Sequence, residues 1–460
     1  MSTPVTKDYL KDSLVRVCRE IYKTGTDKRF KLRTRPYLRR TVTEIGVDKD
    51  DVPTGGAKWE DHIIERPWVI DVLEDAELTQ AIQDAVDAIV QLYDLERTRA
   101  EYEVRQFNLW IAEKAISTGF DQSVINEGAQ IFIADLENAP VSATVKIFLL
   151  GITPRRSSIS IGKDLRIRKV CKDDLTLEYD VAFPPPQKLR IPHSIAEIRM
   201  DVFDRKDLLE HQFAAERLVS FLRLFRFWPV YLTSYSIIFP TITTFGTVSD
   251  PSVPMLGVKG NIIEPEDEEC LEKLYQILLP MLPRNIVYRS GNDPVSIAYK
   301  LYSNALTGEE GSDWKFATAV AGLDALYVSG GVDQQYKLAH RAAKLLSFFG
   351  ETPERVCTIV EESYDIRSRV FHGDNLKAKQ INAIPEYLSF MYEYLRKSIL
   401  LFLFLAKKES LDKKSIIDYV DDSLIGVIRS DGNMLIDKIR SVESKIKFSF
   451  KELGMKSHVN

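Results

Sequence analysis

The chain contains few of the residues that build metal clusters or disulfide frameworks. Of its 460 residues, four are cysteine and six are histidine. The cysteines are far apart and form no Cys-x-x-Cys pair, so their spacing indicates neither a zinc site nor a disulfide network. The HExxH, Walker A and GxSxG motifs are also absent from the sequence. We therefore expect a reduced, intracellular protein with no cofactor and no metal at its functional site.

Long apolar segments are missing as well. The longest, ILLFLFLA at residues 399–406, is too short to cross a bilayer, and the polar N-terminus lacks the apolar core of a signal peptide. These features predict a soluble, cytoplasmic protein that contacts no membrane. The formal net charge of −5 gives no overall attraction to nucleic acid, so any such contact depends on a local basic patch.

The composition is that of a globular protein, with 45% hydrophobic and 28% charged residues. The length suggests two or three domains. We predict an α+β fold, in which an N-terminal mixed helical and antiparallel-sheet region precedes an all-α bundle. The predicted segments are a basic and helical region (1–120), a sheet-containing α+β domain (121–261), a helical bundle (262–408) and a C-terminal helical appendage (409–460).

Periodicity supports this division. Residues 66–118 have helical periodicity, and Asp75 or Thr79 could cap the start of the helix. β-Branched residues and period-two alternation predict strands within 141–152 and 157–170. The C-terminal half is a series of amphipathic segments separated by glycine and proline, which is typical of an up-and-down helical bundle.

The segment SYDIRSRVFHGD (363–374) predicts a helix end. Gly373 stands where a glycine commonly terminates a helix, which places Arg367, Arg369 and His372 in the last two turns. Cations at a helix C-terminus are favourable by about 0.3–1 kcal/mol each, so an ordinary helix end is one interpretation. A site that handles phosphate is the other.

Arg367 and His372 do not share a face of an ideal helix. Five residues turn through about 500°, which leaves these side chains roughly 140° apart. Arg369 and His372, at i and i+3, are closer neighbours. A joint site therefore needs either a deformed helix end or two copies of the protein related by a twofold axis.

Three segments of the C-terminal half follow one another in an informative order: FATAVAGLDALYVSG, YKLAHRAAKLL and SYDIRSRVFHG. Together they resemble the HEPN family (higher eukaryotes and prokaryotes nucleotide-binding), specifically its Apea-like branch, over about residues 290–408. Asp324 stands where that branch usually has glutamate, so the charge is kept with a shorter reach. The N-terminal region is similar in kind to the variable regions that precede such domains.

The resemblance implies a metal-independent endoribonuclease that works as a homodimer with a composite active site, in prokaryotic defence or a toxin-like role. A higher oligomer or a regulatory partner is compatible with it. Arg367 and His372 correspond to the family's Arg-x4-His pair, and Ser368 to the polar residue after the arginine. The implied reaction is attack by the 2′-hydroxyl of RNA, with products that end in a 2′,3′-cyclic phosphate and a 5′-hydroxyl. Histidine exchanges protons near neutral pH, and arginine stabilises phosphoryl oxygens.

Several neighbouring residues have both a structural and a functional interpretation. Asp324 is expected to form a buried salt bridge, for example with Arg341, and it could also position Arg367. Tyr364 is either a core residue or a stacking platform. Arg369 is a phosphate contact, a surface charge or a dimer-interface residue.

The basic run Lys23–Arg40 is the candidate RNA-binding segment, in which Phe30 or Tyr37 could stack on a base. A solvated basic loop is the alternative. Its candidate RNA contacts are Lys28, Arg29, Lys31, Arg33, Arg35, Arg39 and Arg40.

A second hypothesis is a non-catalytic HEPN-like module that binds a nucleotide, dimerises or recruits a partner. The angle between Arg367 and His372 and the aspartate at position 324 are both compatible with it. RNA that stays intact but is tightly bound would distinguish this role from catalysis.

Overall fold

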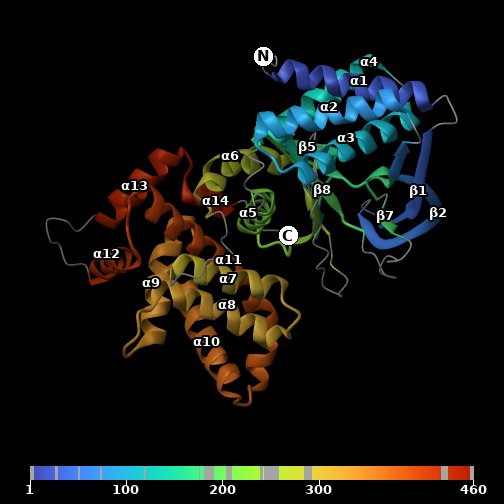
Figure 1. Cartoon of the computed structure of the whole chain (residues 1–460). Coiled ribbons are helices and arrows are strands. Elements are labelled where there is room, and N and C mark those ends of the chain that lie inside the picture. Colours follow the sequence, from blue (N-terminus) through green and yellow to red (C-terminus); the bar gives the residue numbers. More distant parts are fainter. Residues whose placement is uncertain are drawn as a thin grey trace. The chain divides into compact units, whose positions relative to one another are not determined.

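The computed structural model has a mixed α+β fold, as predicted, with a helical C-terminal region (Figure 1). Its described residues are 5–25, 30–49, 52–72, 75–118, 121–175, 177–180, 191–203, 210–238, 242, 258, 260–283, 293–425 and 434–455. The chain divides into two compact units. The first comprises Met1–Phe148, Asp164–His211 and Ser234–Pro251, and the second comprises Leu149–Lys163, Gln212–Thr233 and Ser252–Asn460.

Four helices form the main apolar core of the first unit: α1 (Lys7–Gly25), α2 (Ala76–Tyr93), α3 (Arg97–Thr118) and α4 (Gln122–Leu136). In this core the rings of Phe107 and Phe132 lie 5.0 Å apart between centroids. The Asp75 carboxylate accepts hydrogen bonds from the amides of Glu77 and Leu78, which confirms Asp75 as the cap of α2. Asp94, with a φ of 50°, ends that helix.

A long antiparallel hairpin in the first unit was not predicted. It consists of β1 (Phe30–Val47) and β2 (Pro53–Val72), and β7 (Leu177–Asp180) pairs with the other edge of β1. The helical prediction for 66–118 is therefore wrong over 66–72, and the basic segment up to Arg40 is largely a strand. Apolar and basic residues alternate from Phe30 onwards, a strand pattern that the dense charge and Pro36 obscure.

A second sheet in the first unit confirms the strands predicted after residue 140. It contains β3 (Val141–Leu150), β6 (Leu165–Lys169), β8 (Ser194–Phe203) and, from Ser234 onwards, β9 (Tyr231–Ile238). These strands lie in the order β6, β8, β3, β9, and β6 pairs antiparallel with β8. The 3-10 turn η1 (Lys172–Leu175) packs against β1 of the hairpin.

The second unit is mainly helical. Its strands are β5 (Ser158–Ile161) and the parallel pair β4 (Ile152–Pro154) and β10 (Asn261–Ile263). Its helices are α5 (Glu210–Phe225, from Gln212 onwards), α6 (Glu268–Leu278), α7 (Pro294–Thr307), α8 (Ser312–Tyr327), α9 (Gln334–Leu346), α10 (Pro353–His372), α11 (Ala378–Lys408), α12 (Lys413–Ile425), α13 (Met434–Ile446) and α14 (Phe450–Met455). The described part of this unit also contains the 3-10 turns η2 (Pro265–Asp267), η3 (Leu279–Met281) and η4 (Ser347–Phe349).

Helix α8 occupies the centre of the bundle, where it packs against α7, α10 and α11. Gly322 permits the close approach of α11, because a Cβ atom at this position would lie 2.5 Å from Cδ2 of Leu395. The apolar segment 399–405 of α11 is buried, as predicted. Within the described ranges, no helix combines the length and the apolarity that a membrane crossing requires.

A buried arginine joins α11 to α5. Arg396, with 1% of its surface exposed, donates hydrogen bonds to the carbonyls of Leu224 and Phe225 at the end of α5, at 2.9 and 3.1 Å. Its other guanidinium nitrogens bind the Glu393 carboxylate at 2.9 and 2.6 Å. Helix α5 lies inside the predicted segment 121–261, but these contacts place it with the C-terminal helices.

Candidate functional site

Helix α10 carries the predicted site residues and remains α-helical through His372. Gly373 follows with a φ of 73°, which confirms the predicted glycine at the helix end. The amide of Asp374 donates to the Arg369 carbonyl at 2.9 Å and closes the last turn. Because the helix is regular to its end, no local deformation brings Arg367 and His372 onto one face.

One face of α10 places Arg367 among aromatic rings. The guanidinium carbon lies 5.4 Å from the ring centroid of Tyr364 and 5.2 Å from that of Phe371. Trp314 of α8 packs edge-on against Phe371 at 5.6 Å, and these two side chains are 47% and 43% exposed. Tyr364 is half-buried and donates its hydroxyl hydrogen bond to Gln334 at 3.0 Å. The surface beside Arg367 is therefore both cationic and aromatic.

Asp324 of α8 forms an ion pair with Arg367 of α10. The Arg367 Nη2 atom lies 3.2 Å from Oδ2 of Asp324, and the two side chains are 23% and 20% exposed. The second carboxylate oxygen of Asp324 and the Nε of Arg367 are buried and have no hydrogen-bond partner among the described residues. The pair is thus a single charge-assisted contact rather than a bidentate fork.

Arg341 is not the partner of Asp324, so that expected salt bridge is wrong. Its Nε and Nη2 atoms form a bidentate pair with Asp421 at 2.8 and 2.7 Å, and its Nη1 donates to the Tyr327 carbonyl at 2.6 Å. Asp421 lies on α12, to which the sequence assigned no role. Arg341 therefore has a structural function, since it links α9 to α12 and to the end of α8.

A second cation lies close to Asp324. Lys413 Nζ donates to the carbonyls of Ala325 and Val328 at the end of α8, at 2.8 and 2.5 Å. Burial raises the pKa of Asp324 above its ordinary value, and the charges of Arg367 and Lys413 oppose that rise. Burial also lowers the pKa of Lys413. The two cationic neighbours of Asp324 thus favour its ionised form, and its burial disfavours that form.

The other face of α10 is more open. The exposed His372 imidazole has no hydrogen-bond or ion-pair partner among the residues that the structure describes. Ser368 is half-buried and lies four residues earlier, so it shares a face with His372. Arg369 forms an i,i+4 ion pair with Asp365 at 3.3 Å, and Gln380 donates to the same carboxylate at 2.7 Å. Arg369 is thus a paired surface charge in the single chain.

The structure divides the predicted basic patch. Lys28 and Arg29 lie outside the described residues, whereas Lys31, Arg33, Arg35, Arg39 and Arg40 lie on β1. Successive strand residues point to opposite faces of a sheet, so Arg39 and Arg40 cannot both contact an RNA bound to one face of β1. The Arg40 guanidinium binds Asp61 of β2 in a bidentate pair at 2.7 and 2.8 Å. A continuous basic loop is therefore not present in this part of the chain.

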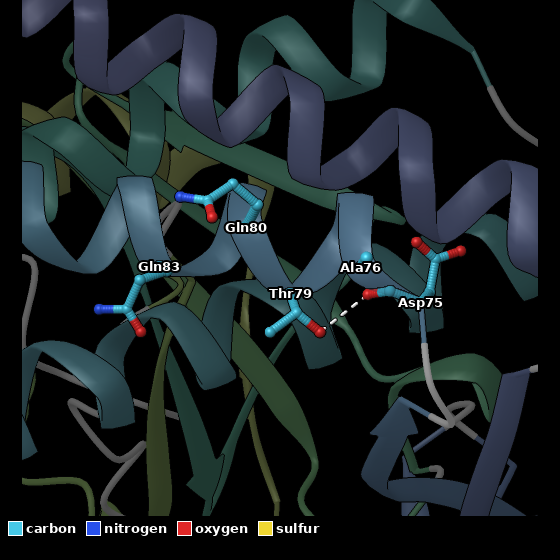
Figure 2. A pocket seen from close by; sticks show the side chains of 5 residues that line it. All are labelled: Asp75, Ala76, Thr79, Gln80 and Gln83. Atoms are coloured by element: carbon cyan, nitrogen blue, oxygen red, sulfur yellow. Dashed lines mark hydrogen bonds between the residues drawn. The ribbon is translucent and has the colours of Figure 1, made fainter.

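Figure 2 shows a pocket at the start of α2. It is lined by Asp75, Ala76, Thr79, Gln80 and Gln83. The Asp75 carboxylate already accepts from the first helical amides, and the Thr79 hydroxyl donates to the Asp75 carbonyl at 2.8 Å. These bonds occupy the donors that would otherwise attract an anion to a helix N-terminus, so the pocket lacks the chemistry of a phosphate site.

Two members of the α10 surface were not identified from the sequence. Phe371 lies four residues after Arg367, a spacing that places both side chains on one face and that could have indicated its role. Trp314 is far away in the sequence and reaches this surface only through the packing of α8 against α10.

No protein-family model matches this chain, and no curated protein or solved structure shows significant similarity to it.

Proposed function

We propose that the protein is a metal-independent endoribonuclease whose active site is assembled from the α10 helices of two copies of the chain. The observation that carries this proposal is the setting of Arg367: Asp324 anchors it, and exposed aromatic rings flank it. The resemblance to the Apea-like HEPN branch agrees with this assignment. The proposed setting is the cytoplasm, in prokaryotic defence or a toxin-like role.

The chemistry needs a base, an acid and a stabiliser of phosphate charge. In a site with two His372 residues, one neutral imidazole takes the proton of the 2′-hydroxyl, and the 2′-oxygen attacks phosphorus. The bond from phosphorus to the 5′-oxygen breaks, and the protonated imidazole of the other copy protonates the leaving oxygen. Arg367 stabilises the charge on the phosphoryl oxygens, and Ser368 donates a hydrogen bond to one of them. The products end in a 2′,3′-cyclic phosphate and a 5′-hydroxyl.

The aromatic surface suits an unpaired RNA strand. Stacking of a base on an aromatic side chain contributes about 1–3 kcal/mol, and Trp314 and Phe371 are both partly open to solvent. A base stacked there would place its phosphate near the Arg367 guanidinium. The substrate we propose is therefore single-stranded RNA or a loop.

The regular geometry of α10 supports a shared site. Arg367 and His372 stay on different faces of one helix, because α10 does not distort before its end. A second copy of α10 related by a twofold axis would offer its own His372 to the Arg367 of the first.

Purified full-length protein and RNA test the reaction. Removal of the general base or acid lowers cleavage by about 10²–10⁴-fold, so we expect a loss of this size for His372→Ala and a comparable loss for Arg367→Ala. Arg355→Ala, on an exposed part of α10, is the matched arginine control, and His62→Ala is the matched histidine control. Unchanged cleavage in both site variants would show that the mechanism is wrong.

Mixing wild-type protein with an equal amount of His372→Ala tests the shared site. Random exchange places about half of the wild-type chains in mixed dimers, and a mixed dimer has only one of the two His372 imidazoles that the reaction uses. We therefore expect the cleavage rate per wild-type chain to fall to about half. If all the reacting groups act within one chain, the rate per wild-type chain stays unchanged.

The non-catalytic module is the alternative outcome. It is supported if RNA stays intact, is bound tightly, and is released when Trp314 or Phe371 is replaced by alanine. In that case Arg367 would contribute to binding without any cyclic-phosphate product.

A further inference from the structure

Three side chains with metal-binding groups converge between α9 and α10, away from the Arg367 surface. They are His340 of α9 and Cys357 and Glu361 of α10, and one ligand atom of each lies within 4.8 Å of the others. The Cys357 Sγ atom is 3.8 Å from Nδ1 and 3.9 Å from Nε2 of His340, and 3.7 Å from Oε1 of Glu361. All three residues are half-buried.

These separations match a tetrahedral zinc site before the ligands close on the ion. Zinc bonds of about 2.3 Å to sulfur and about 2.0–2.2 Å to nitrogen or oxygen place neighbouring ligand atoms about 3.5 Å apart at the tetrahedral angle. The distances from the Cys357 Sγ to Nε2 of His340 and to Oε1 of Glu361 exceed this value by only a few tenths of an ångström. Cys357 and Glu361 are at i and i+4, so the helix itself holds them on one face.

The surroundings of His340 restrain its ring and favour the tautomer that a metal ligand requires. Its Nδ1 lies 3.0 Å from the Tyr336 carbonyl oxygen. Donation of the Nδ1 hydrogen to this oxygen leaves the Nε2 lone pair free, which is the arrangement that most metal-bound histidines adopt. The Tyr336 ring stacks on the imidazole at 3.9 Å and limits its rotation. Gln335 donates to the Glu361 carbonyl at 2.8 Å and fixes the two helices to each other.

A Cys–His nucleophile would use similar residues but needs different electrostatics. Burial and the neighbouring Glu361 carboxylate raise the pKa of the Cys357 thiol, whereas an activated nucleophile needs a lowered one. A divalent cation would reverse this balance, because it binds the thiolate and neutralises the carboxylate.

We propose that His340, Cys357 and Glu361 bind a divalent transition-metal ion. The mixed sulfur, nitrogen and oxygen ligands fit Zn²⁺ best, with water in the fourth position. The ion joins α9 to α10 and stabilises this helix pair. It lies outside the Arg367–His372 surface and takes no part in RNA cleavage.

Cobalt provides a direct test on the full-length protein. After treatment with a chelator, titration with Co²⁺ should produce the charge-transfer band of a cobalt–thiolate bond and the visible bands of tetrahedral Co²⁺, with a stoichiometry of about one ion per chain. Zn²⁺ should displace the cobalt and abolish both signals. A titration of the wild-type protein without a thiolate band overturns the proposal, whatever the variants do.

Variants assign the ligands. Loss of even an outer-shell partner weakens metal binding by about 10–100-fold, so Cys357→Ser, His340→Ala and Glu361→Gln should each weaken Zn²⁺ binding at least that much. The matched controls are Cys171→Ser, at an exposed cysteine, and Glu354→Gln, at an exposed glutamate of α10. Zn²⁺ binding that survives in Cys357→Ser with wild-type affinity contradicts the assignment.

Stability and cleavage separate this proposal from the ribonuclease. Chelation should lower the melting temperature of the wild-type protein and leave that of Cys357→Ser unchanged, whereas Arg367→Ala should retain the ion. The products of RNA cleavage should be the same with and without the metal below the melting temperature. A metal requirement for the cleavage products would contradict the structural role of the ion.

Discussion

The substitutions Asp324→Asn and Arg367→Gln should each weaken the packing of α8 against α10, and by unequal amounts. Asp324→Asn removes a charge whose burial is itself unfavourable, so its net effect should be small, about 0–1 kcal/mol. Arg367→Gln leaves the Asp324 carboxylate partly buried without its main partner. Loss of one partner of such a bond costs about 1–3 kcal/mol.

The coupling between the two residues follows from their geometry. Exposed ion pairs contribute about 0–1 kcal/mol, and hydrogen bonds to charged groups about 1.5–3 kcal/mol. The Asp324–Arg367 pair is about one-fifth exposed and has a single contact at 3.2 Å. We therefore expect a coupling of about 1 kcal/mol in a double-mutant cycle.

Native-state hydrogen exchange, read by mass spectrometry, measures this coupling locally. The opening free energies of α8 and α10 should follow the cycle, while those of α2 in the other unit should not change. A coupling indistinguishable from zero would show that Asp324 does not hold Arg367. A larger effect of Asp324→Asn than of Arg367→Gln would show that burial of the Asp324 charge is not unfavourable.

The same pair gives a pH dependence with a defined sign. Because the pKa of Asp324 is raised in the folded protein, the folded state binds a proton before the unfolded chain does. Its contribution to stability therefore increases as the pH falls through the folded pKa, and it is complete below the ordinary value of 3.8. The opening free energy of wild type minus that of Asp324→Asn should rise on acidification; a fall would refute the assignment.

Three further predictions concern packing and thiol reactivity. Gly322→Ala should lower the unfolding free energy by about 1–3 kcal/mol, measured in urea, because its Cβ would meet Leu395 at 2.5 Å; unchanged stability would mean that α11 moves away freely. Arg396→Met should lower it by about 3–5 kcal/mol, since the buried Glu393 carboxylate keeps only Lys397 as a cationic partner and two carbonyls of α5 lose their donor; a stabilised variant would contradict this. Alkylation of the folded protein should label the exposed Cys171 and spare the buried Cys18, whose pKa burial raises; equal labelling by mass spectrometry would refute the burial of Cys18.

The sequence predicted most elements whose signals are local. The helices of the C-terminal half have apolar periodicity, and the end of α10 follows from Gly373 and its left-handed backbone. The hairpin of β1 and β2 was missed because its stability comes from cross-strand pairing, for example of Arg40 with Asp61. The sequence of β1 alone shows only a charge-rich segment in which apolar and polar residues alternate weakly.

The candidate site was predictable only within α10. Arg367, Ser368 and His372 occupy one continuous helix, whereas Asp324 and Trp314 reach Arg367 through the packing of α8. The sequence places aspartate at 324 but does not decide which arginine it binds. The same limit applies to the proposed metal site, in which two ligands lie on α10 and the third on α9. A search for Cys-x-x-Cys pairs cannot detect such a set.

The contact of Arg396 with α5 bears on the choice of fragments for expression, because it ties α5 to the helices of the C-terminal half. A fragment beginning near residue 262 would contain every predicted catalytic residue but would lack the carbonyls of Leu224 and Phe225. The buried guanidinium of Arg396 would then lose two of its hydrogen-bond acceptors. We therefore expect a fragment that begins at residue 212, and so keeps α5, to be more soluble than one that begins near residue 262.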